Sequence, residues 1–502
     1  MLDTQRKDLL AGVAGSGTMG RGIVQVLAQC GVRVLVFDAQ PGAAARGKTA
    51  IAQSLAKLVE KGRAAQADAD ATLARIEIVD ALAAFAPCRL VVEAIIERLD
   101  AKQELLRALE AIVADDCILA SNTSSLSVTA MAAACRKPGR VAGYHFFNPV
   151  PVMKVVEVVD GVLTEAWVGD ALLALAKRFG HTAVRCQDTP GFIVNHQGRA
   201  YVPESLRILT EGIADHATID RILCDSAGFR LGPFGLMDLV GLDIAHGVME
   251  SMYDQYYQEP KYRPCFLSPM RVAAGLLGRK TGRGWYTYTK EGAVAVAEQP
   301  VPAANAGPVW VAPDAASLKE LVGKLGARLD SGATPGADSL CMVAPLGKDA
   351  TTTAVDLGLD AKRTVAVDPL FGFAKRRTLM TTPVTTPETR DAAHALLASD
   401  GAKVSVINDS AGFVAQRVVA HVVNVGCDIA QMRIASPADL DRAVVLGLSY
   451  PHGPLAFGDA VGAGKVLTIL ANMHAFYEEP RYRPSPWLKR RAALGVSLLT
   501  AE

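Results

Sequence analysis

The stretch Leu9-Leu-Ala-Gly-Val-Ala-Gly-Ser-Gly-Thr-Met-Gly20 joins an apolar run to three glycines spaced as Gly-x-Gly-x-x-Gly. The apolar run predicts a strand, and the residues after it predict a helix through about Cys30. Gly15 permits a tight turn, Gly17 lets the backbone approach a pyrophosphate, and Gly20 lets the helix pack near the sheet. The stretch therefore predicts the first strand, turn and helix of a Rossmann fold.

The next strand-like run, Val32–Phe37, ends at Asp38, which lies 18 residues after Gly20. An acid at that place accepts hydrogen bonds from a ribose hydroxyl and repels a 2′-phosphate, so the pattern favours NAD over NADP. Thr18 and Met19, between the last two glycines, are assigned to the same site because N–H groups at a helix start face phosphates. The alternative is a fold of this kind with an empty site.

Further strand-like runs follow at Leu90–Ala94, at Cys117–Ser121 and from Val155, separated by helical patterns. Strands that alternate with helices predict a parallel sheet with helices on both faces. After Asp188 the pattern becomes mainly helical up to about residue 290. The Ala- and Pro-rich stretch Val294–Pro308 has no periodicity and predicts a linker.

The second half repeats the first. A shift of 221 residues carries Asp188-Thr-Pro-Gly-Phe192 onto Asp409-Ser-Ala-Gly-Phe413, and Gly232-Pro233 onto Gly453-Pro454. We expect an α/β Rossmann domain followed by an all-α domain, then a degenerate α/β region and a second all-α copy. The expected bounds are 1–187 for the NAD-binding Rossmann domain, 188–292 for the helical domain, 293–308 for the linker, 309–402 for the degenerate Rossmann-like domain, and 403–502 for the second helical copy.

Composition excludes several classes of protein. Lys plus Arg (52) nearly equals Asp plus Glu (51), and no basic run occurs, so we expect no nucleic-acid partner. No apolar run is long enough to span a membrane, and Met1–Leu10 does not resemble a signal peptide. The nine cysteines form no C-x-x-C pair. We therefore expect no metal site and a cytoplasmic location.

Two polar segments are candidates for the chemistry. Ser121-Asn-Thr-Ser-Ser-Leu126 follows a strand at the edge where open α/β sheets bind ligands, although it equally fits a helix cap. His145, in Gly143-Tyr-His-Phe-Phe-Asn-Pro149, has Glu157 twelve residues on. A histidine suits the base that alcohol oxidation needs, and a carboxylate would fix its tautomer. A histidine in an apolar stretch is otherwise an ordinary core residue.

These motifs, together with Met153-Lys-Val-Val-Glu157, Asp188–Asn195 and Lys280-Thr-Gly-Arg-Gly-Trp-Tyr286, resemble the 3-hydroxyacyl-CoA dehydrogenases over residues 8–290. The resemblance implies NAD-dependent oxidation of an (S)-3-hydroxyacyl-CoA to a 3-oxoacyl-CoA, as in the β-oxidation of fatty acids. It makes His145 the catalytic base and Glu157 its partner. It also implies that Ser124 and Asn195 orient the substrate oxygen and the histidine.

The same resemblance implies the binding residues. The NAD contacts would be Gly15, Gly17, Thr18, Met19, Gly20, Asp38, Glu97, Lys102, Asn148 and Lys280. The coenzyme A contacts would be Ser54, Lys61 and Ser124. Ser54 and Lys61 lie in Gly47–Lys61, where apolar residues at helical spacing leave basic residues on the other side. A lysine there can pair with nucleotide phosphates, or simply belong to a solvated helix face.

The second half departs from the family pattern. Gln416 stands where the first half has Asn195, and Asp368-Pro-Leu-Phe-Gly-Phe373 replaces the histidine segment. We therefore expect one active site per chain and a structural role for the second half. The protein would be a homodimer, or a monomer whose duplicated helical domains pair within the chain.

The long form, with Tyr482-Arg-Pro-Ser485 near its end, is similar to enzymes of bacterial phenylacetate breakdown. That likeness implies 3-hydroxyadipyl-CoA as the substrate, whereas short forms act on 3-hydroxybutyryl-CoA. Two rival functions stay open at this stage. One is a dehydrogenase of free hydroxy or imino acids, which does not need the basic helix. The other is a non-enzymatic structural protein on the same fold.

Overall fold

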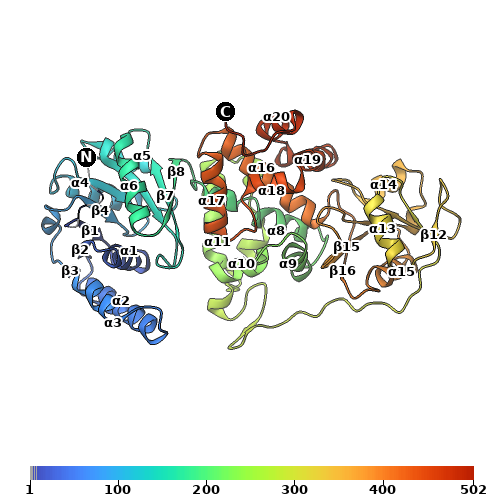
Figure 1. Ribbon diagram of the computed structural model, residues 1–502, viewed down its shortest axis with the longest axis horizontal. Coiled ribbons are helices and arrows are strands. Elements are labelled where there is room, and N and C mark those ends of the chain that lie inside the picture. Colours follow the sequence, from blue (N-terminus) through green and yellow to red (C-terminus); the bar gives the residue numbers. More distant parts are fainter. Residues whose placement is uncertain (1–3, 5, 7) are drawn as a thin grey trace. The chain divides into compact units, whose positions relative to one another are not determined.

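The computed structural model describes residues 4, 6 and 8–502, so the expectation about Met1–Leu10 falls partly outside the described residues. The chain forms two compact units. The first contains residues up to 196 together with 432–448, and the second contains 197–431 and 449–502. The chain therefore leaves the second unit at residue 432 and returns to it at residue 449. Its course can be followed by colour in Figure 1.

The first unit contains an eight-stranded sheet in the order β3-β2-β1-β4-β5-β6-β7-β8. Every neighbouring pair is parallel except β6 and β7, which pair antiparallel. The parallel sheet expected from the sequence is confirmed apart from this one hairpin. The strands are β1 (Leu10–Ala14), β2 (Arg33–Phe37), β3 (Ile76–Ile78), β4 (Leu90–Glu93), β5 (Ile118–Ser121), β6 (Val141–Phe146), β7 (Val155–Asp160) and β8 (Thr182–Gln187).

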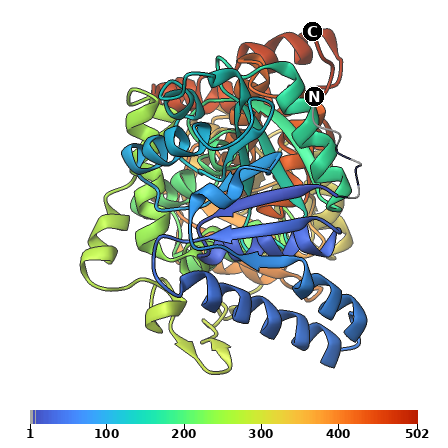
Figure 2. The same ribbon diagram turned by 90° about the vertical axis from the view of Figure 1, so that its left-hand side faces the viewer.

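Helices cover this sheet because their apolar faces need a partner. In α1, Ile23, Val24 and Leu27 are buried in one core with Val13 and Val34 of the strands. Figure 2 shows α2 and α3 as neighbouring helices in blue, and the two pack against each other. The helices are α1 (Thr18–Gln29), α2 (Ala43–Glu60), α3 (Gln66–Ala74), α4 (Leu99–Glu110), α5 (Val128–Ala132), α6 (Ala166–Arg178), α7 (Val194–Gly198) and α17 (Pro437–Leu448).

The second unit holds two copies of a helical arrangement. One 18-residue helix in the second copy, α16, corresponds to α7 plus α8 in the first. Pro203 explains the break in the first copy, because proline lacks the N–H that a continuous helix needs, whereas Asn424 stands at that place in α16. The helices are α8 (Val202–Thr210), α9 (His216–Asp225), α10 (Pro233–Val240), α11 (Leu242–Gln255), α12 (Leu267–Ala273), α16 (Val414–Gln431), α18 (Pro454–Val461), α19 (Ala463–Tyr477) and α20 (Pro486–Leu494).

A six-stranded sheet in the order β12-β11-β13-β14-β15-β16 confirms the degenerate α/β region. It repeats the antiparallel step of the first sheet, here between β14 and β15. Between the small hairpin β9–β10 and β11, residues 294–308 form neither helix nor strand. The elements are β9 (Tyr288–Thr289), β10 (Gly292–Ala293), β11 (Val309–Val311), α13 (Ala316–Lys324), β12 (Leu329–Asp330), β13 (Leu340–Val343), α14 (Ala350–Asp356), β14 (Thr364–Val367), β15 (Arg376–Thr381), α15 (Pro387–Leu397) and β16 (Lys403–Ile407).

The last strand of each sheet receives one backbone hydrogen bond from a distant segment, and the two bonds match under the repeat. Gln187 N donates to Ile434 O at 2.9 Å, and Asn408 N donates to Ile213 O at 3.0 Å. Shifting Gln187 and Ile213 by 221 residues gives Asn408 and Ile434. The segment before α17 therefore caps the first sheet, and the segment before α9 caps the second.

The repeated Asp-x-x-Gly-Phe motif has a structural explanation. Asp188 accepts hydrogen bonds from Val128 N (3.0 Å) and Thr129 N (2.7 Å) at the start of α5. Asp409 accepts the matching bonds from Ala350 N and Thr351 N at the start of α14. Two N–H groups that a helix leaves open are thus satisfied in each half. Gly191 and Gly412 follow with φ of 74° and 75°, a conformation that favours glycine.

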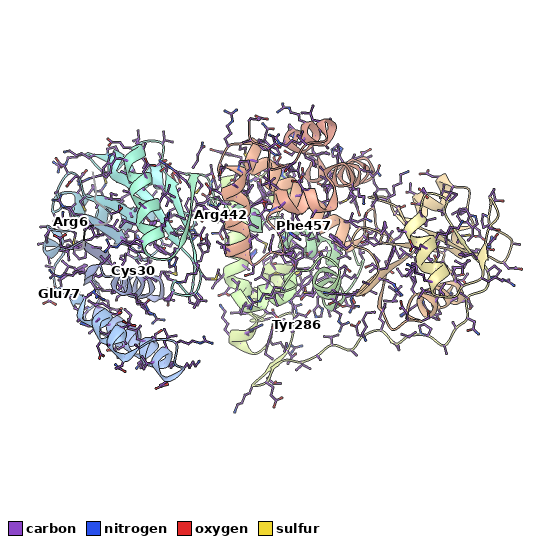
Figure 3. The ribbon with its side chains drawn as sticks, viewed as in Figure 1. Arg6, Cys30, Glu77, Tyr286, Arg442 and Phe457 are labelled. Carbon is purple, nitrogen blue, oxygen red and sulfur yellow. The ribbon has the colours of Figure 1, made fainter. Side chains whose placement is uncertain are left out.

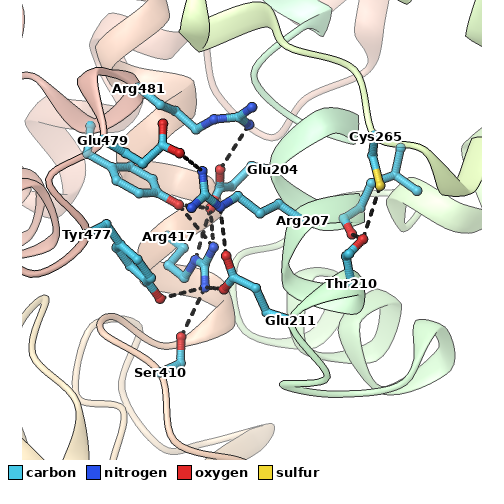
Figure 4. A network of polar contacts seen from close by, with 12 residues as sticks. Glu204, Arg207, Thr210, Glu211, Cys265, Ser410, Arg417, Tyr477, Glu479 and Arg481 are labelled. Carbon is cyan, nitrogen blue, oxygen red and sulfur yellow. Dashed lines mark hydrogen bonds and ion pairs between the residues drawn. The ribbon is translucent and has the colours of Figure 1, made fainter.

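Buried charges join the two helical copies (Figure 4). Arg417 of α16 is fully buried, and its Nε donates to Glu204 Oε1 of α8 at 2.9 Å. Arg481 approaches the other oxygen of Glu204 at 3.4 Å, and the Tyr482 hydroxyl donates to Glu204 at 2.8 Å. Burial alone would raise the pKa of Glu204, but Arg417 and Arg481 lower it to about 2. The contact between the copies therefore contains ionised groups that satisfy one another.

Among the described residues, no single helix has the length and apolar character needed to cross a membrane. Helices α18 and α19 reach that length and composition only as a pair, and they meet at a bend of 95°.

Candidate functional site

The antiparallel hairpin β6–β7 brings the predicted base and acid together. His145 and Glu157 are directly opposite in its register, and His145 Nδ1 lies 2.6 Å from Glu157 Oε2. Both side chains are buried, and Phe147 packs on the imidazole with ring centroids 4.4 Å apart. A carboxylate can only accept a hydrogen bond, so Nδ1 carries the proton and Nε2 is left as the basic nitrogen.

The other oxygen of Glu157 is held by a turn of the backbone. Glu157 Oε1 accepts hydrogen bonds from Ile193 N (3.0 Å) and Val194 N (2.9 Å), where α7 begins. With three donors around it, the carboxylate has one fixed orientation. Asn195 follows on the same helix, and its Nδ2 donates to Ser124 O at 3.3 Å. The structure thus gathers His145, Glu157, Asn195 and Ser124 in the first unit.

Glu97 orders the Ser-Asn-Thr-Ser-Ser loop. Its Oε1 accepts hydrogen bonds from Ser124 N (2.9 Å), Thr123 Oγ1 (2.7 Å) and Ser125 Oγ (3.1 Å). Burial acts to raise the pKa of Glu97, but the charge of Lys102 and these hydrogen bonds outweigh it and lower the pKa. Glu97 is therefore an ionised anchor for the loop that carries Ser124.

Lys102 is 1% exposed, so in this conformation its ammonium is shielded from a ligand in solvent. It contacts both oxygens of Glu93 at 2.8 Å and lies 3.2 Å from Glu97. Glu93, which sequence reasoning missed, is fully buried and also binds the Ser121 hydroxyl. A carboxylate ending the apolar run of β4 was the available signal, because a buried acid needs a partner.

The glycine loop has the geometry of a dinucleotide cradle. A Cβ on Gly15 would lie 2.5 Å from Ala94 O, and one on Gly20 would lie 2.0 Å from Gly15 O, so both positions require glycine. A Cβ on Gly17 would meet nothing within 4 Å, and Gly17 caps α1 without a side-chain hydrogen bond. Open space above a helix N-terminus fits a pyrophosphate.

Asp38 lies beside this cradle at the end of β2. Ser16 N and Ser16 Oγ donate to its Oδ2 at 2.8 and 2.6 Å, and Gln40 N donates to Oδ1 at 2.9 Å. Burial acts to raise the pKa of Asp38, but these hydrogen bonds outweigh it and lower the pKa. An ionised, fixed carboxylate is suited to a ribose hydroxyl. Ser16 was also missed in the sequence, where it occupies a variable position of the glycine motif.

We predict that Gly17→Val raises the KM for NAD about tenfold or more while leaving the fold intact. The backbone of Gly17 (φ −62°, ψ −167°) lies in the extended region that valine adopts, so only the phosphate space is lost. Steady-state kinetics and thermal unfolding measure the two effects. Gly464→Val, at another open glycine, is the control. An unchanged KM for NAD would contradict the assignment of the cradle.

The remaining candidates are spread over both units. Ser54 on α2, Lys61 at its C-terminus and Asn148 after β6 are all exposed. Lys280 belongs to the second unit, where its Nζ pairs with Asp243 at 2.5 Å. Tyr286, from the same motif, donates its hydroxyl to Asp220 at 2.9 Å (Figure 3). The contacts of Tyr286 indicate that this end of the motif is structural.

Comparison with known families decides which dehydrogenases these are. Residues 10–189 match the NAD-binding domain of 3-hydroxyacyl-CoA dehydrogenase, and the C-terminal domain of that family matches twice, over 191–288 and 412–497. The chain belongs to the 3-hydroxyacyl-CoA dehydrogenase family. The expected enzyme class, NAD as cofactor and the duplication of the helical domain are all confirmed.

Relatives of this family cover the chain to different extents. The 3-hydroxyadipyl-CoA dehydrogenase of Escherichia coli K12 is 36% identical over 96% of this chain and 97% of its own length. A probable 3-hydroxybutyryl-CoA dehydrogenase of Bacillus subtilis is 39% identical over 56% of this chain and 97% of its own length. The crystal structure of a 3-hydroxybutyryl-CoA dehydrogenase from Escherichia coli K12 superposes with a TM-score of 0.86 at 34% identity, covering 97% of this chain and 98% of that one.

The second sheet has the same hairpin without the dehydrogenase chemistry. Asp368 N donates to Thr378 O at 3.1 Å, which sets Asp368 opposite Thr378 as His145 is opposite Glu157. Gln416 Nε2 donates to Asp368 Oδ1 at 2.9 Å. Burial raises the pKa of Asp368 to about 6, although the Gln416 hydrogen bond opposes the rise.

This shift predicts how Asp368 affects stability. A carboxyl whose pKa rises on folding favours the folded state when protonated, so its contribution falls as pH rises from about 4 through 6. Asp368→Asn, which cannot ionise, should stabilise the protein by about 1–3 kcal/mol at pH 8 and little at pH 4. Urea unfolding at both pH values checks this. An equal gain at the two pH values would show that charge is not the cause.

Proposed function

We propose that the chain oxidises the 3-hydroxyl of 3-hydroxyadipyl-CoA with NAD in phenylacetate breakdown. The observation that carries this is the match over nearly the whole length to the Escherichia coli 3-hydroxyadipyl-CoA dehydrogenase, whereas the Bacillus subtilis 3-hydroxybutyryl-CoA relative covers about half of the chain. The second candidate is 3-hydroxybutyryl-CoA, favoured by the name of the Escherichia coli crystal structure that covers 97% of this chain.

In the proposed mechanism, His145 Nε2 takes the proton of the 3-hydroxyl while C3 loses its hydrogen as hydride and becomes the carbonyl carbon. NAD supplies the hydride acceptor, the nicotinamide ring. Glu157 stabilises the imidazolium that forms, because its carboxylate lies 2.6 Å from Nδ1. Ser124 and Asn195 orient the substrate oxygen and the histidine. The reverse reduction uses the same groups in the opposite order.

The binding roles are part of the same proposal. Gly15, Gly17, Gly20 and their neighbours Thr18 and Met19 would hold the pyrophosphate, and Asp38 the adenine ribose. Glu97, Asn148 and Lys280 would contact NAD, with the buried Lys102 acting through Glu97. Ser54, Lys61 and Ser124 would contact coenzyme A, and the exposure of the first two suits a large, charged ligand.

We further propose the domain bounds 1–187, 188–292, 309–402 and 403–502, with 293–308 as the linker. We infer a monomer in which the helical copies pair within the chain. The buried contacts of Glu204 with Arg417 and Arg481 support this pairing. A cytoplasmic enzyme is consistent with nine cysteines that are all free.

The deciding experiment compares three thioesters. We expect kcat/KM for 3-hydroxyadipyl-CoA to exceed that for 3-hydroxyhexanoyl-CoA, which has the same length without the terminal carboxylate, and that for 3-hydroxybutyryl-CoA, each by about tenfold, or 1.4 kcal/mol. A preference for 3-hydroxybutyryl-CoA would establish the second candidate. NADH oxidation with acetoacetyl-CoA no faster than in His145→Gln would reject the dehydrogenase function altogether. Calorimetry with coenzyme A separates this enzyme from a dehydrogenase of free hydroxy acids.

A further inference from the structure

One helix of the first unit comes from far along the sequence. Helix α17 packs on strands β7 and β8, and the segment before it bonds to the end of β8. Gln187 N donates to Ile434 O, and Cys186 forms a β-bridge with Ala435. This helix lies between α16 and α18 in the chain, so it belongs to the second helical copy. The catalytic hairpin is therefore supported by a part of the protein that carries no catalytic residue.

The contact reaches the turn that holds Glu157. A Cβ on Gly447 of α17 would lie 2.9 Å from both methyl carbons of Val194. Val194 is 2% exposed and β-branched, so its side chain has little freedom to move aside. The N–H of Val194 is one of the two that bind Glu157 Oε1. Three successive contacts thus connect Gly447 to the imidazole of His145.

We propose that α17 is a positioning element for the His145–Glu157 pair, with Gly447 as the residue that sets the place of Val194. The proposal rests on the proposed function and gives the second half a part in it. Only glycine allows α17 to come this close to Val194. A side chain at position 447 displaces the Val194 N–H, loosens one oxygen of Glu157 and turns the imidazole away from the reacting hydroxyl. Small misplacements of a catalytic group reduce rates strongly.

The test is Gly447→Ala, combined with Val194→Ala as a suppressor that makes room for the new methyl group. In Gly447→Ala we expect kcat to fall about tenfold with KM for the thioester changed less than about twofold, because binding contacts stay in place. In the double variant kcat should return to within about threefold of Val194→Ala alone. Gly464→Ala on α19 is the matched control, since its Cβ would meet nothing within 4 Å.

The outcomes divide clearly. Wild-type kcat in Gly447→Ala, or a double variant no faster than Gly447→Ala, would overturn the proposal. A fall in kcat shared by Gly464→Ala would do the same, because it would reflect a general response to helix substitution. Hydrogen exchange at the Ile193 and Val194 amides is measured in the same variants. If the wild type lacked dehydrogenase activity, the proposed function would fail, and unchanged exchange would separately reject the contact.

Discussion

Replacing His145 by glutamine is expected to lower kcat about 10²–10⁴-fold, the range in which a positioned base contributes to a proton transfer. Glutamine keeps hydrogen-bonding groups near Glu157 but has no nitrogen that can take the substrate proton. The KM values for NAD and thioester should change little, because neither ligand depends on the imidazole for its main binding contacts. Initial rates of NADH formation over a range of both substrates measure this.

Glu157→Gln tests the second member of the pair. The amide cannot stabilise an imidazolium, and its NH₂ group competes with the Ile193 and Val194 N–H donors for the same space. We expect kcat to fall about 10²-fold. Asp160→Asn, on the same strand but paired with Arg185 near the surface, should keep kcat within about twofold. Equal effects of the two substitutions would contradict the role of Glu157.

Replacing Arg417 by methionine is expected to lower the free energy of unfolding by about 3–5 kcal/mol, because it removes one partner of a buried ion pair. Arg417 Nη1 also contacts Glu211 Oε2 at 2.6 Å and the Tyr477 hydroxyl at 3.0 Å (Figure 4). Methionine fills much of the space but satisfies none of these acceptors. Urea unfolding followed by circular dichroism measures the loss.

Two comparisons show whether the charge is the cause. Arg442→Met removes an exposed ion pair with Asp439 and should cost less than about 1 kcal/mol. Glu204→Leu combined with Arg417→Met should recover much of the loss, because no charge is then buried alone. The lowered pKa of Glu204 predicts that wild-type stability falls as pH drops from 4.5 toward 2. A double variant as unstable as the sum of the single variants would contradict this account.

The local parts of the fold could be predicted from the sequence. The glycine spacing fixes β1, its turn and α1 because only glycine fits at Gly15 and Gly20, and Asp38 follows by simple counting. The duplication was also visible, because its motifs recur at one shift. The strands β3 and β8 were not separated from their surroundings. Ile76–Ile78 is too short for a periodicity, and Thr182–Gln187 mixes polar and apolar residues.

What the sequence could not reveal depends on contacts between distant segments. The pairing of His145 with Glu157 follows from an antiparallel hairpin, and two strands twelve residues apart fit a parallel crossover less well than a hairpin, which was not recognised. The burial of Lys102 depends on Glu93, whose charge was overlooked within an apolar strand. The place of α17 on β7 and β8 has no local signal, because glycine at 447 looks like any glycine in a helix.

The capping of β8 by residues 432–448 has a consequence for biosynthesis. A ribosome releases the chain from its amino terminus, so the catalytic hairpin emerges long before the helix that covers it. Until α17 has been translated, the outer strand of the nascent enzyme presents unpaired backbone groups, which invite pairing with a neighbouring polypeptide. Translation stalled in the linker should therefore yield an aggregation-prone intermediate rather than an active fragment.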